Sequence, residues 1–291
     1  MGNNIIIIGG KGQLGQCFEE KVKGAGLAFN FIFLGSGDLN ISNPADVENI
    51  FKQYQPAYCI NCAAYTAVDH AEEDLGNAFE INEFAVKRLA ENALKYNTTL
   101  IHISTDFVFD GSSSVPLTET LPTSPVNVYG LSKLKGEQEI EAILEKFYII
   151  RTSWLYSEKA NNFVKTMLKL AQSRSELTVI YDQVGTPTYA MDLAEVILRI
   201  VQNDPLQYGL YHYSNEGVAS WYDFAKAVFD LSETAIKVLP VASSAFVTKA
   251  KRPHYSVLDK TKIKTALGIE IPYWRESLNI CLNNLSKAAS N

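Results

Sequence analysis

Cysteine is scarce in this sequence, with four residues in a chain of 291. Four cysteines in a chain of this length are too few for a disulfide scaffold. Cys59 and Cys62 do form a CxxC pair, but they lie in the apolar stretch AYCINCAAY, which is typical of a buried strand. Their odd separation would point the two side chains to opposite faces of that strand, which argues against a redox or metal role. We therefore expect reduced thiols and a cytoplasmic protein.

Long apolar runs and an excess of basic charge are also absent. No apolar run approaches the roughly 20 residues that are needed to cross a bilayer. The short run of isoleucines at residues 5–8 has no basic residue before it and ends in glycines, unlike a signal peptide. The net charge is -6 and the pI is about 5.4, whereas non-specific nucleic-acid binding needs a basic surface. We expect neither a membrane nor a nucleic acid as a partner.

The residues that usually bind metal ions show no ligand pattern. The four histidines are scattered without the spacing of a metal site, at His70, His102, His212 and His254. The acidic cluster at residues 72–74 is more simply explained as stabilising the N-terminus of a helix through the helix dipole. The sequence therefore predicts no metal site.

Apolar strands and amphipathic helices alternate through the first 150 residues. The segments that we expect to be strands are 4–10, 29–37, 57–64, 98–105 and 148–156. The segments that we expect to be helices are 13–26, 43–55, 73–97 and 128–147. Continuous apolar strands separated by helices indicate a parallel sheet that is covered on both faces. The predicted fold class is therefore α/β, with a Rossmann-type doubly wound parallel sheet.

The second half of the chain is less regular. We expect helices at 163–174, 190–203 and 220–231, and short strands at 177–182 and 209–215. The segment 238–273 carries scattered Pro, Ser and Lys and is expected to cap a site. We predict a dinucleotide-binding Rossmann domain over residues 1–155 and a smaller, mainly substrate-binding C-terminal part over 156–291. Some segments of that part, at about 178–215, are expected to return to the Rossmann sheet.

A glycine-rich loop, GGKGQLG, connects the first expected strand to the first expected helix. It places Gly9, Gly12 and Gly15 three residues apart, in the pattern GxxGxxG rather than the usual GxGxxG. Glycines at this position let the chain turn tightly and let backbone amides approach a pyrophosphate at the helix N-terminus. The alternative is that these glycines serve only helix–strand packing. The position at the start of a βαβ unit favours a dinucleotide cofactor.

The end of the second expected strand bears on the choice of cofactor. Enzymes that prefer NAD carry an acidic residue here, which binds the ribose 2′-hydroxyl. This chain has Gly35 and Ser36 instead, which leave space for a 2′-phosphate. No arginine stands beside them, although Lys11 in the glycine loop is a candidate partner for that phosphate. The pattern favours NADPH and leaves NADH open.

Hydroxyl side chains and a tyrosine–lysine pair follow the fourth expected strand. Ser104 and Thr105 stand at its carboxyl end, where ligand chemistry occurs in open parallel sheets. Tyr129 and Lys133 lie one turn apart on one face of the next expected helix. A lysine ammonium near a phenol favours the phenolate, so we expect the pKa of Tyr129 to be drawn down from its usual value of about 10. A second pair of this spacing, Tyr222 and Lys226, lies among aromatic residues that are typical of a core.

Taken together, these motifs resemble those of the extended short-chain dehydrogenase/reductase family. Within it, further strings look like those of the dTDP-4-dehydrorhamnose reductases: NCAAYTAVDHAE, STDFVFDG, SPVNVYGLSKLKGE, RTSWLY, NNFVKTML, DQVGTPT, GLYHYSN and RPHYSVLD. These stretches, with the glycine loop, run from residue 9 to residue 259. Related nucleotide-sugar dehydratases carry a glutamate after the Thr-Asp pair, where this chain has Phe107. A reductase needs no such acid.

The resemblance implies a function and a set of site residues. It implies NAD(P)H-dependent reduction of the 4-keto group of dTDP-4-dehydro-L-rhamnose to dTDP-L-rhamnose, in deoxysugar and polysaccharide biosynthesis. The implied catalytic residues are Tyr129, Lys133 and Thr105. The implied cofactor-binding residues are Gly9, Gly12, Gln13, Leu14, Asn40, Ile41, Ala64, Tyr65 and Thr66, together with Tyr129 and Lys133. The residues implied to bind the nucleotide-sugar substrate are Thr105, Asp106, Trp154 and Arg252.

Two other functions are consistent with the same motifs. One is a reductase or epimerase of another nucleotide sugar, since the same three catalytic residues would serve it. The other is a non-catalytic NADP-binding regulatory subunit, against which the intact Thr105, Tyr129 and Lys133 argue. The protein is expected to be a monomer or a homodimer.

Overall fold

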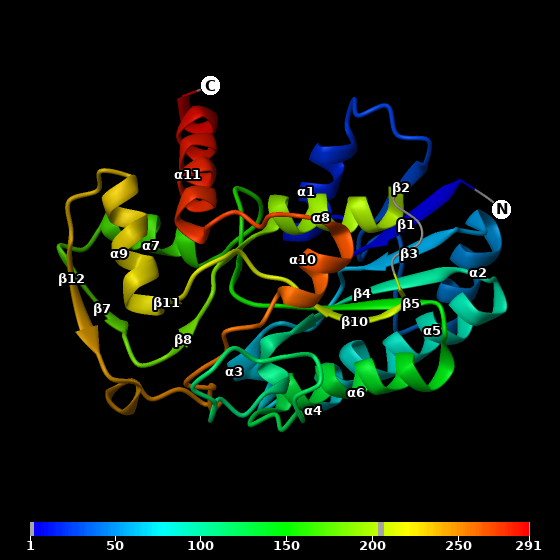
Figure 1. The fold of residues 1–291 in the computed structure, drawn as a ribbon, viewed down its shortest axis with the longest axis horizontal. Coiled ribbons are helices and arrows are strands. Elements are labelled where there is room, and N and C mark those ends of the chain that lie inside the picture. The colour runs from blue at the N-terminus through cyan, green and yellow to red at the C-terminus, as the bar shows by residue number, and fades with distance from the viewer. Residues whose placement is uncertain (1–2, 203–206, 291) are drawn as a thin grey trace.

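A six-stranded parallel sheet forms the larger part of the molecule (Figure 1). The computed structural model describes residues 3–202 and 207–290. The strands are β1 (Asn4–Ile8), β2 (Asn30–Leu34), β3 (Tyr58–Asn61), β4 (Thr99–Thr105), β5 (Phe147–Thr152) and β10 (Gly209–His212). Their order across the sheet is β10-β5-β4-β3-β1-β2, and every neighbouring pair is parallel. The predicted Rossmann-type α/β class is confirmed.

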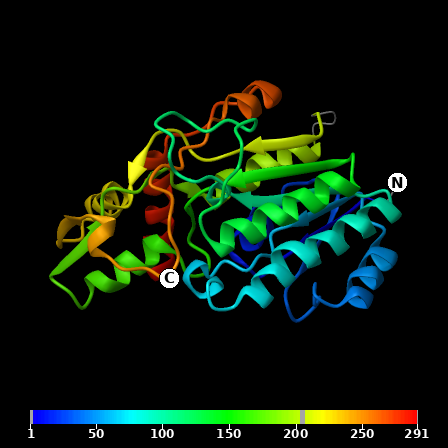
Figure 2. The same ribbon diagram turned by 90° about the horizontal axis from the view of Figure 1, so that it is seen from below.

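Helices cover both faces of this sheet (Figure 2). The helical elements of this part are α1 (Gln13–Val22), α2 (Pro44–Tyr54), α3 (Val68–Ala71), α4 (Leu75–Phe79), η1 (Glu80–Phe84), α5 (Ala85–Lys95), η2 (Asp106–Val108), α6 (Val128–Ile143), α8 (Ala190–Gln202) and α10 (Thr261–Leu267). Helices α1 and α8 pack together on one face, and α2, α5 and α6 pack in a row on the other. Position 203, the last of the helix expected at 190–203, lies outside the described residues.

The alternation of side chains along β1 explains why both faces are covered. Ile5 and Ile7 pack in the hydrophobic cluster that contains residues of α1 and α8, whereas Ile6 and Ile8 pack in the cluster that contains residues of α2, α5 and α6. All four isoleucines are at most 2% exposed. Burial of each contributes about 2 kcal/mol relative to exposure, so a strand this apolar is stable only between two layers of helices.

The segment expected as a single helix at 73–97 contains a π-helical turn. The chain runs from α4 through η1 into α5. In the π-helical η1, backbone hydrogen bonds join residues five apart rather than four apart as in an α-helix. Such turns are frequent at functional sites. The buried Asn82 lies within it.

A smaller second part is built mainly from the C-terminal half. Its elements are β6 (Leu155–Tyr156), α7 (Phe163–Ala171), β7 (Glu176–Ile180), β8 (Val184–Gly185), β9 (Thr188–Tyr189), β11 (Ala219–Ser220), α9 (Trp221–Leu231), β12 (Lys237–Val241), η3 (Ser243–Ala245) and α11 (Trp274–Ser290). Strands β7 and β12 pair in parallel, and α7, α9 and α11 bury an aromatic-rich core. Of the segment at about 178–215, α8 and β10 lie on the main sheet, whereas β7 does not.

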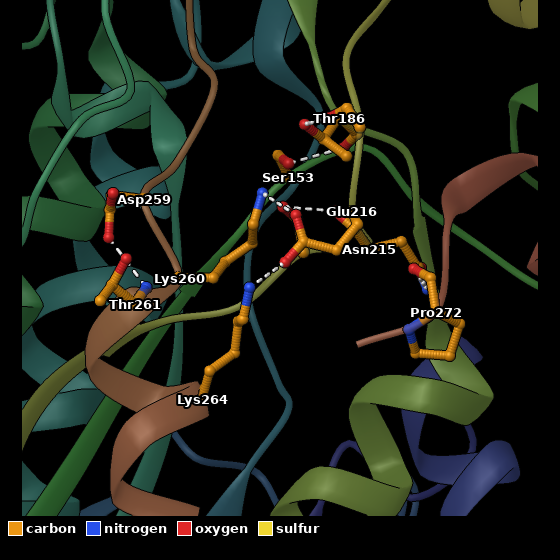
Figure 3. Close-up of polar contacts among 11 residues, drawn as sticks. Ser153, Thr186, Asn215, Glu216, Asp259, Lys260, Thr261, Lys264 and Pro272 are labelled. Atoms are coloured by element: carbon orange, nitrogen blue, oxygen red, sulfur yellow. Dashed lines mark hydrogen bonds and ion pairs between the residues drawn. The ribbon is translucent and has the colours of Figure 1, made fainter. Parts of the chain in front are cut away.

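Polar contacts tie together the segments that pass between the two parts (Figure 3). The Ser153 hydroxyl donates to the Thr186 carbonyl at 2.7 Å, and the Asn215 side chain donates to the Pro272 carbonyl at 3.2 Å. Lys264 of α10 lies 2.8 Å from Glu216, which follows β10. These contacts fix the smaller part over the carboxyl ends of the central strands. Among the described residues, no helix has the length and apolarity needed to span a bilayer.

Candidate active site

The glycine loop forms a tight turn between β1 and α1. Gly9 has φ +78°, a conformation that favours glycine, and its carbonyl accepts the Gly12 N–H at 2.8 Å. A Cβ on Gly15 would lie 2.5 Å from the Gly9 carbonyl oxygen, so a side chain there is excluded. Gly12 begins α1 without a side-chain cap. Gly12, Gln13 and Leu14 line the adjoining cavity, so the uncapped N-terminus of α1 is available there for an anion.

Two adjoining cavities form one groove across the carboxyl ends of the strands, at the point where the strand order reverses between β1 and β3. The first, of about 500 Å³, is lined by the predicted residues Gly9, Gly12, Asn40, Ile41 and Ala64. The second, of about 560 Å³, is lined by Gly12, Gln13, Leu14, Ala64, Thr66, Thr105, Asp106, Tyr129, Lys133 and Trp154. Ligands bind at such switch points in open α/β sheets. The elongated shape and the glycine cradle fit a dinucleotide.

Tyr65 differs from the other predicted cofactor residues, because its side chain lines neither cavity. Its hydroxyl donates to Asp74 at 3.1 Å and lies 2.5 Å from Nδ1 of His70. Its backbone, however, is held by Asn82, whose side chain accepts the Tyr65 N–H at 2.9 Å and donates to the Tyr65 carbonyl at 3.1 Å. The Asn82 amide also donates to the Ser132 hydroxyl on α6 at 3.0 Å.

The sequence analysis missed Asn82. Through its contacts with Tyr65 and Ser132, this residue connects the loop that lines the groove to the helix that carries Tyr129 and Lys133. The only signal in the sequence was an asparagine in the middle of a helical pattern, where this residue type is unfavourable. A bond partner 50 residues away could not be inferred from that signal.

Tyr129 lies in the first turn of α6, which begins after Asn127; the Asn127 side chain accepts the Gly130 N–H at 2.7 Å. Its ring packs edge-on against Phe107, with the ring centroids 5.7 Å apart. Burial raises the pKa of Tyr129 to about 12, against a hydrogen bond with Thr105 that lowers it. The expectation that Lys133 draws this pKa down is wrong, because burial outweighs the groups that favour the phenolate. The phenol is therefore protonated at neutral pH and available as a proton donor.

Lys133 is buried, and its ammonium is directed at β4 rather than at Tyr129. Nζ donates to the Ile103 carbonyl at 2.6 Å and lies 3.1 Å from Nε2 of His102. Burial lowers the pKa of Lys133 to about 8, although Glu137 and Cys62 favour the charged form. On the same strand β4, the Ser104 hydroxyl donates to Glu137 and so does not reach the reacting groups.

Thr105 and Asp106 occupy the turn after β4. The Thr105 hydroxyl accepts the Phe107 N–H and donates to Asp106 Oδ1, both at 3.1 Å. Asp106 is 2% exposed, and burial raises its pKa to about 6, while hydrogen bonds from Ser256 and Thr105 oppose that rise. Three groups able to hold a carbonyl or hydroxyl oxygen, namely Thr105, Asp106 and Tyr129, thus line one cavity.

A third cavity, of about 290 Å³, adjoins the second on the side of the smaller part. It shares Phe107, Trp154 and Trp221 with the second cavity and extends to Arg252. The indole rings of Trp154 and Trp221 stack with centroids 3.6 Å apart and planes 9° apart. The sequence analysis missed Trp221, because the aromatics of α9 have the pattern of a core helix.

Arg252 forms a two-point ion pair with Asp69. Nη1 lies 3.1 Å from Oδ1 and Nη2 lies 2.5 Å from Oδ2, in the bidentate geometry typical of arginine and carboxylate. This pairing holds the pKa of Asp69 below its usual value. The other tyrosine–lysine pair lies elsewhere: Lys226, on α9, is 3.9 Å from Asp230. Within the described part of the chain, no three His, Cys, Asp or Glu side chains gather as metal ligands.

Comparisons with known proteins identify the family. The sequence profile of the RmlD substrate binding domain matches residues 3–287. A dTDP-4-dehydrorhamnose reductase of Aggregatibacter actinomycetemcomitans is 39% identical over 284 residues, which cover 94% of this chain and 96% of that protein. The chain belongs to the dTDP-4-dehydrorhamnose reductase family.

Solved members of the dTDP-4-dehydrorhamnose reductase family share the whole fold. The crystal structure of a dTDP-4-dehydrorhamnose reductase from Clostridium acetobutylicum superposes with a TM-score of 0.93 at 40% identity, covering 97% of this chain and 99% of that one. A member from Bacillus anthracis, solved in complex with NADP, superposes with the same TM-score at 36% identity, covering 98% and 100%. The family predicted from the motifs is confirmed.

Proposed function

We propose that this protein reduces the 4-keto group of dTDP-4-dehydro-L-rhamnose to a hydroxyl, giving dTDP-L-rhamnose, with NADPH or NADH as the reductant. The single observation that supports this most strongly is the meeting of Thr105, Tyr129 and Lys133 in one cavity that continues into the glycine-loop groove. The names of the family members point to the same reaction.

Each of the three residues has a role that follows from its surroundings. The cofactor, when bound, supplies the hydride that adds to C4 of the sugar. Tyr129 holds its proton at neutral pH and gives it from Oη to the sugar oxygen, since an alkoxide is a far stronger base than a phenolate. Thr105 positions that oxygen through its hydroxyl. Lys133 is fixed by its hydrogen bond to the Ile103 carbonyl, and from there it orients the bound cofactor.

NADPH fits the adenosine end of the groove better than NADH. The stem of Lys11 lies against Gly35, where an added Cβ would come within 2.7 Å of the lysine Cγ. Both residues line the first cavity together with Ser36. A lysine and a hydroxyl at this place complement a 2′-phosphate. Asp38, the acid at this strand end, accepts the Gly35 N–H at 2.8 Å and does not line the first cavity. The family member from Bacillus anthracis was solved with NADP.

The third cavity is the proposed site of the nucleotide diphosphate. Its stacked indoles supply flat apolar surface for a base or sugar, and its Arg252 supplies a guanidinium for a phosphate. Asp69 now holds that guanidinium in two-point contact. A substrate diphosphate must therefore share Arg252 with Asp69 or displace it.

A panel of substrates tests the proposed function. The protein is incubated with reduced cofactor and, separately, with dTDP-4-dehydro-L-rhamnose, other nucleotide-linked 4-ketosugars and nucleotide sugars without a keto group. We expect cofactor oxidation with the first compound and a product reduced at C4. Epimerisation without cofactor consumption would show an epimerase. Cofactor binding with no turnover on any member of the panel would overturn the catalytic assignment.

We also infer how the chain is organised around this reaction. Residues 1–155 hold the cofactor and residues 156–291 mainly hold the substrate, because the third cavity lies largely on the smaller part. The four cysteines are free thiols, as expected for a protein of the reducing cytoplasm. A monomer or a homodimer is proposed, which sedimentation at micromolar concentration would distinguish.

A further inference from the structure

The side chain of Gln13 joins the start of α1 to the smaller part of the protein. Its Nε2 donates to the Leu155 carbonyl on β6 at 3.1 Å. Its Oε1 accepts from the Ser157 hydroxyl at 3.0 Å and from the Asn162 amide at 2.7 Å. These three partners lie 142 to 149 residues further along the chain. A side chain that the motifs assign to the cofactor is therefore bound to the part of the protein that holds the substrate pocket.

Backbone contacts fix the orientation of both amides in this cluster. The Leu155 carbonyl can only accept, so the Gln13 nitrogen must face it. The Asn162 nitrogen donates to the Ser157 carbonyl at 2.7 Å, and the Asn162 oxygen accepts the Lys165 N–H at 3.2 Å. Where Asn162 meets Gln13, a nitrogen therefore faces an oxygen. Both polar atoms of the Gln13 amide thus have partners of the correct kind.

Asn162 connects Gln13 to the third cavity. It is the N-cap of α7, and its side chain bonds the backbone of the first turn. Phe163 and Met167, in the first two turns of α7, line the third cavity. The ring centroids of Phe163 and Trp221 lie 4.8 Å apart. The start of α7 is therefore one wall of the proposed nucleotide site, and Gln13 bonds it from the side of the cofactor groove.

The segment from Trp154 to Asn162 contains two residues in the left-handed region of backbone conformation. Trp154 has φ +47° and Ala160 has φ +49°. This conformation costs free energy in residues other than glycine, and it persists only where surrounding contacts hold it. Gln13 bonds the segment next to Trp154, at Leu155, and again at Asn162. The same side chain therefore holds Trp154, which lines both the second and the third cavity.

We propose that Gln13 is a positioning residue for the substrate, which sets Trp154 and the start of α7 relative to the cofactor groove. In this arrangement the glycine loop binds the cofactor diphosphate through backbone N–H groups, and the Gln13 side chain acts on the nucleotide end of the substrate. The inference rests on the proposed function, which assigns the third cavity to the nucleotide diphosphate of the substrate.

Calorimetric titrations of the whole protein with dTDP alone and with NADPH alone test the direction of this effect. Gln13→Met preserves the length and helix propensity of the side chain but removes its three hydrogen bonds. We expect the dissociation constant of dTDP to rise about tenfold and that of NADPH to stay within about threefold. An NADPH affinity that falls as much as the dTDP affinity, or more, would overturn the proposal. So would two unchanged affinities.

A variant on the other side of the contact tests whether the two residues act together. Asn162→Ser keeps an N-cap for α7 but lacks the amide that reaches Gln13. Each single variant should weaken dTDP binding about tenfold, and the double variant should be about as weak as either one. A loss of about 100-fold in the double variant would mean that the two side chains act independently, contrary to the proposal.

Gln16→Met is the matched control. Gln16 lies one turn further along α1, but its side chain donates to the Lys11 carbonyl at 2.8 Å, within the glycine loop. This variant should leave the affinity for dTDP unchanged. If it weakened dTDP binding as much as Gln13→Met does, the effect would come from α1 in general, and the assignment of Gln13 would be wrong.

Hydrogen exchange without any ligand separates this contact from the proposed function. In Gln13→Met, the amides of residues 157–171 should exchange about tenfold faster than in the wild type, whereas those of α5 should not change. Gln16→Met should leave both segments unchanged. Equal exchange in Gln13→Met and the wild type would refute the positioning role. If dTDP does not bind the wild type but the exchange is as expected, the assignment of the third cavity fails and the positioning of α7 by Gln13 stands.

Discussion

At the scale of single residues, the chemistry depends on how burial changes side chains that are ordinary elsewhere. The spacing of Tyr129 and Lys133 was visible in the sequence, but the expected effect of one on the other was wrong. Lys133 contacts β4, and burial raises the pKa of Tyr129 to about 12. The partner of Lys133, His102, lies 31 residues away, and no local pattern could have connected them.

Lys11 is predicted to select the cofactor. In Lys11→Ala the KM for NADPH should rise about tenfold, because one charged contact to the 2′-phosphate is lost. The KM for NADH should stay within about twofold in the same variant, which makes NADH the internal control. Steady-state kinetics with both cofactors measures this. Equal changes for the two cofactors would place the lysine away from the 2′-position.

Asp106, a buried carboxyl in the site, is predicted to destabilise the folded protein at neutral pH. Its folded pKa of about 6 lies above the ordinary 3.8, so stability is greatest below pH 3.8 and is lost as pH rises through 6. The full effect is at most roughly 3 kcal/mol. The Tm of Asp106→Asn relative to that of the wild type should therefore increase as pH rises from 4 to 7, while kcat/KM falls.

The control for this carboxyl is Asp110, an exposed residue four positions along the same loop, whose pKa is held below its usual value. Asp110→Asn should show no gain over the same range of pH. A gain of equal size in both variants would mean that net charge, not burial, is responsible.

At the scale of elements, the parallel sheet was predictable from the sequence, but the π-helical turn between α4 and α5 was not. Runs such as residues 5–8 are apolar at every position, which requires two covered faces, so the parallel sheet follows from the sequence. The π-helical turn at Glu80–Phe84 was not foreseen, because the reason for it is tertiary. Asn82 lies in that turn and bonds both Tyr65 and Ser132, which are distant in sequence.

Close contact between η1 and α6 predicts a steric effect at Gly136. A Cβ there would lie 2.1 Å from the Asn82 carbonyl oxygen, so Gly136→Ala must move the π-turn or the helix. We expect a loss of about 1 to 3 kcal/mol in the free energy of unfolding. Denaturant titration measures it.

Gly76 in α4 provides the comparison, because a Cβ there would meet nothing within 4 Å. Gly76→Ala should be neutral or gain about 0.5 to 1 kcal/mol, as alanine does in an open helical position. If both alanines were tolerated equally, η1 and α6 would not be as closely packed as described.

At the scale of the whole molecule, the reaction needs both parts of the protein in a fixed relative position. The sheet carries the cofactor groove, and the smaller part carries most of the third cavity. The motif resemblance identified residues on both parts, including Trp154 and Arg252. It could not supply their partners, Trp221 and Asp69, since stacking and ion pairing arise only when distant segments fold together.

The ion pairs of Glu216 predict an acid-sensitive contact between α10 and the segment that leads from β10 to the smaller part. Burial alone would raise the pKa of Glu216, but Lys264 and Lys260 hold it below its usual 4.5. Its stabilising effect is therefore present above pH 4.5 and is lost as pH falls through the lowered pKa. Glu216→Gln should cost roughly 1 to 2 kcal/mol at neutral pH, as measured by denaturant unfolding, and less in acid.

The exposed ion pair of Glu176 and Lys237, with N and O 2.7 Å apart, serves as the control. Glu176→Gln should change the free energy of unfolding by less than about 0.5 kcal/mol, as is typical of surface pairs. A comparable loss of stability in both variants would show that the ion pairs of Glu216 contribute no more than an exposed surface pair.

The most direct test of the central claim is the turnover of Tyr129→Phe with dTDP-4-dehydro-L-rhamnose and NADPH. Removing one hydroxyl deletes the proton donor and leaves the ring that packs on Phe107. We predict a fall in kcat of roughly 10³-fold, with the dissociation constant of NADPH within about threefold of the wild-type value. A variant that retains near wild-type turnover would contradict the assignment of Tyr129 as the proton donor.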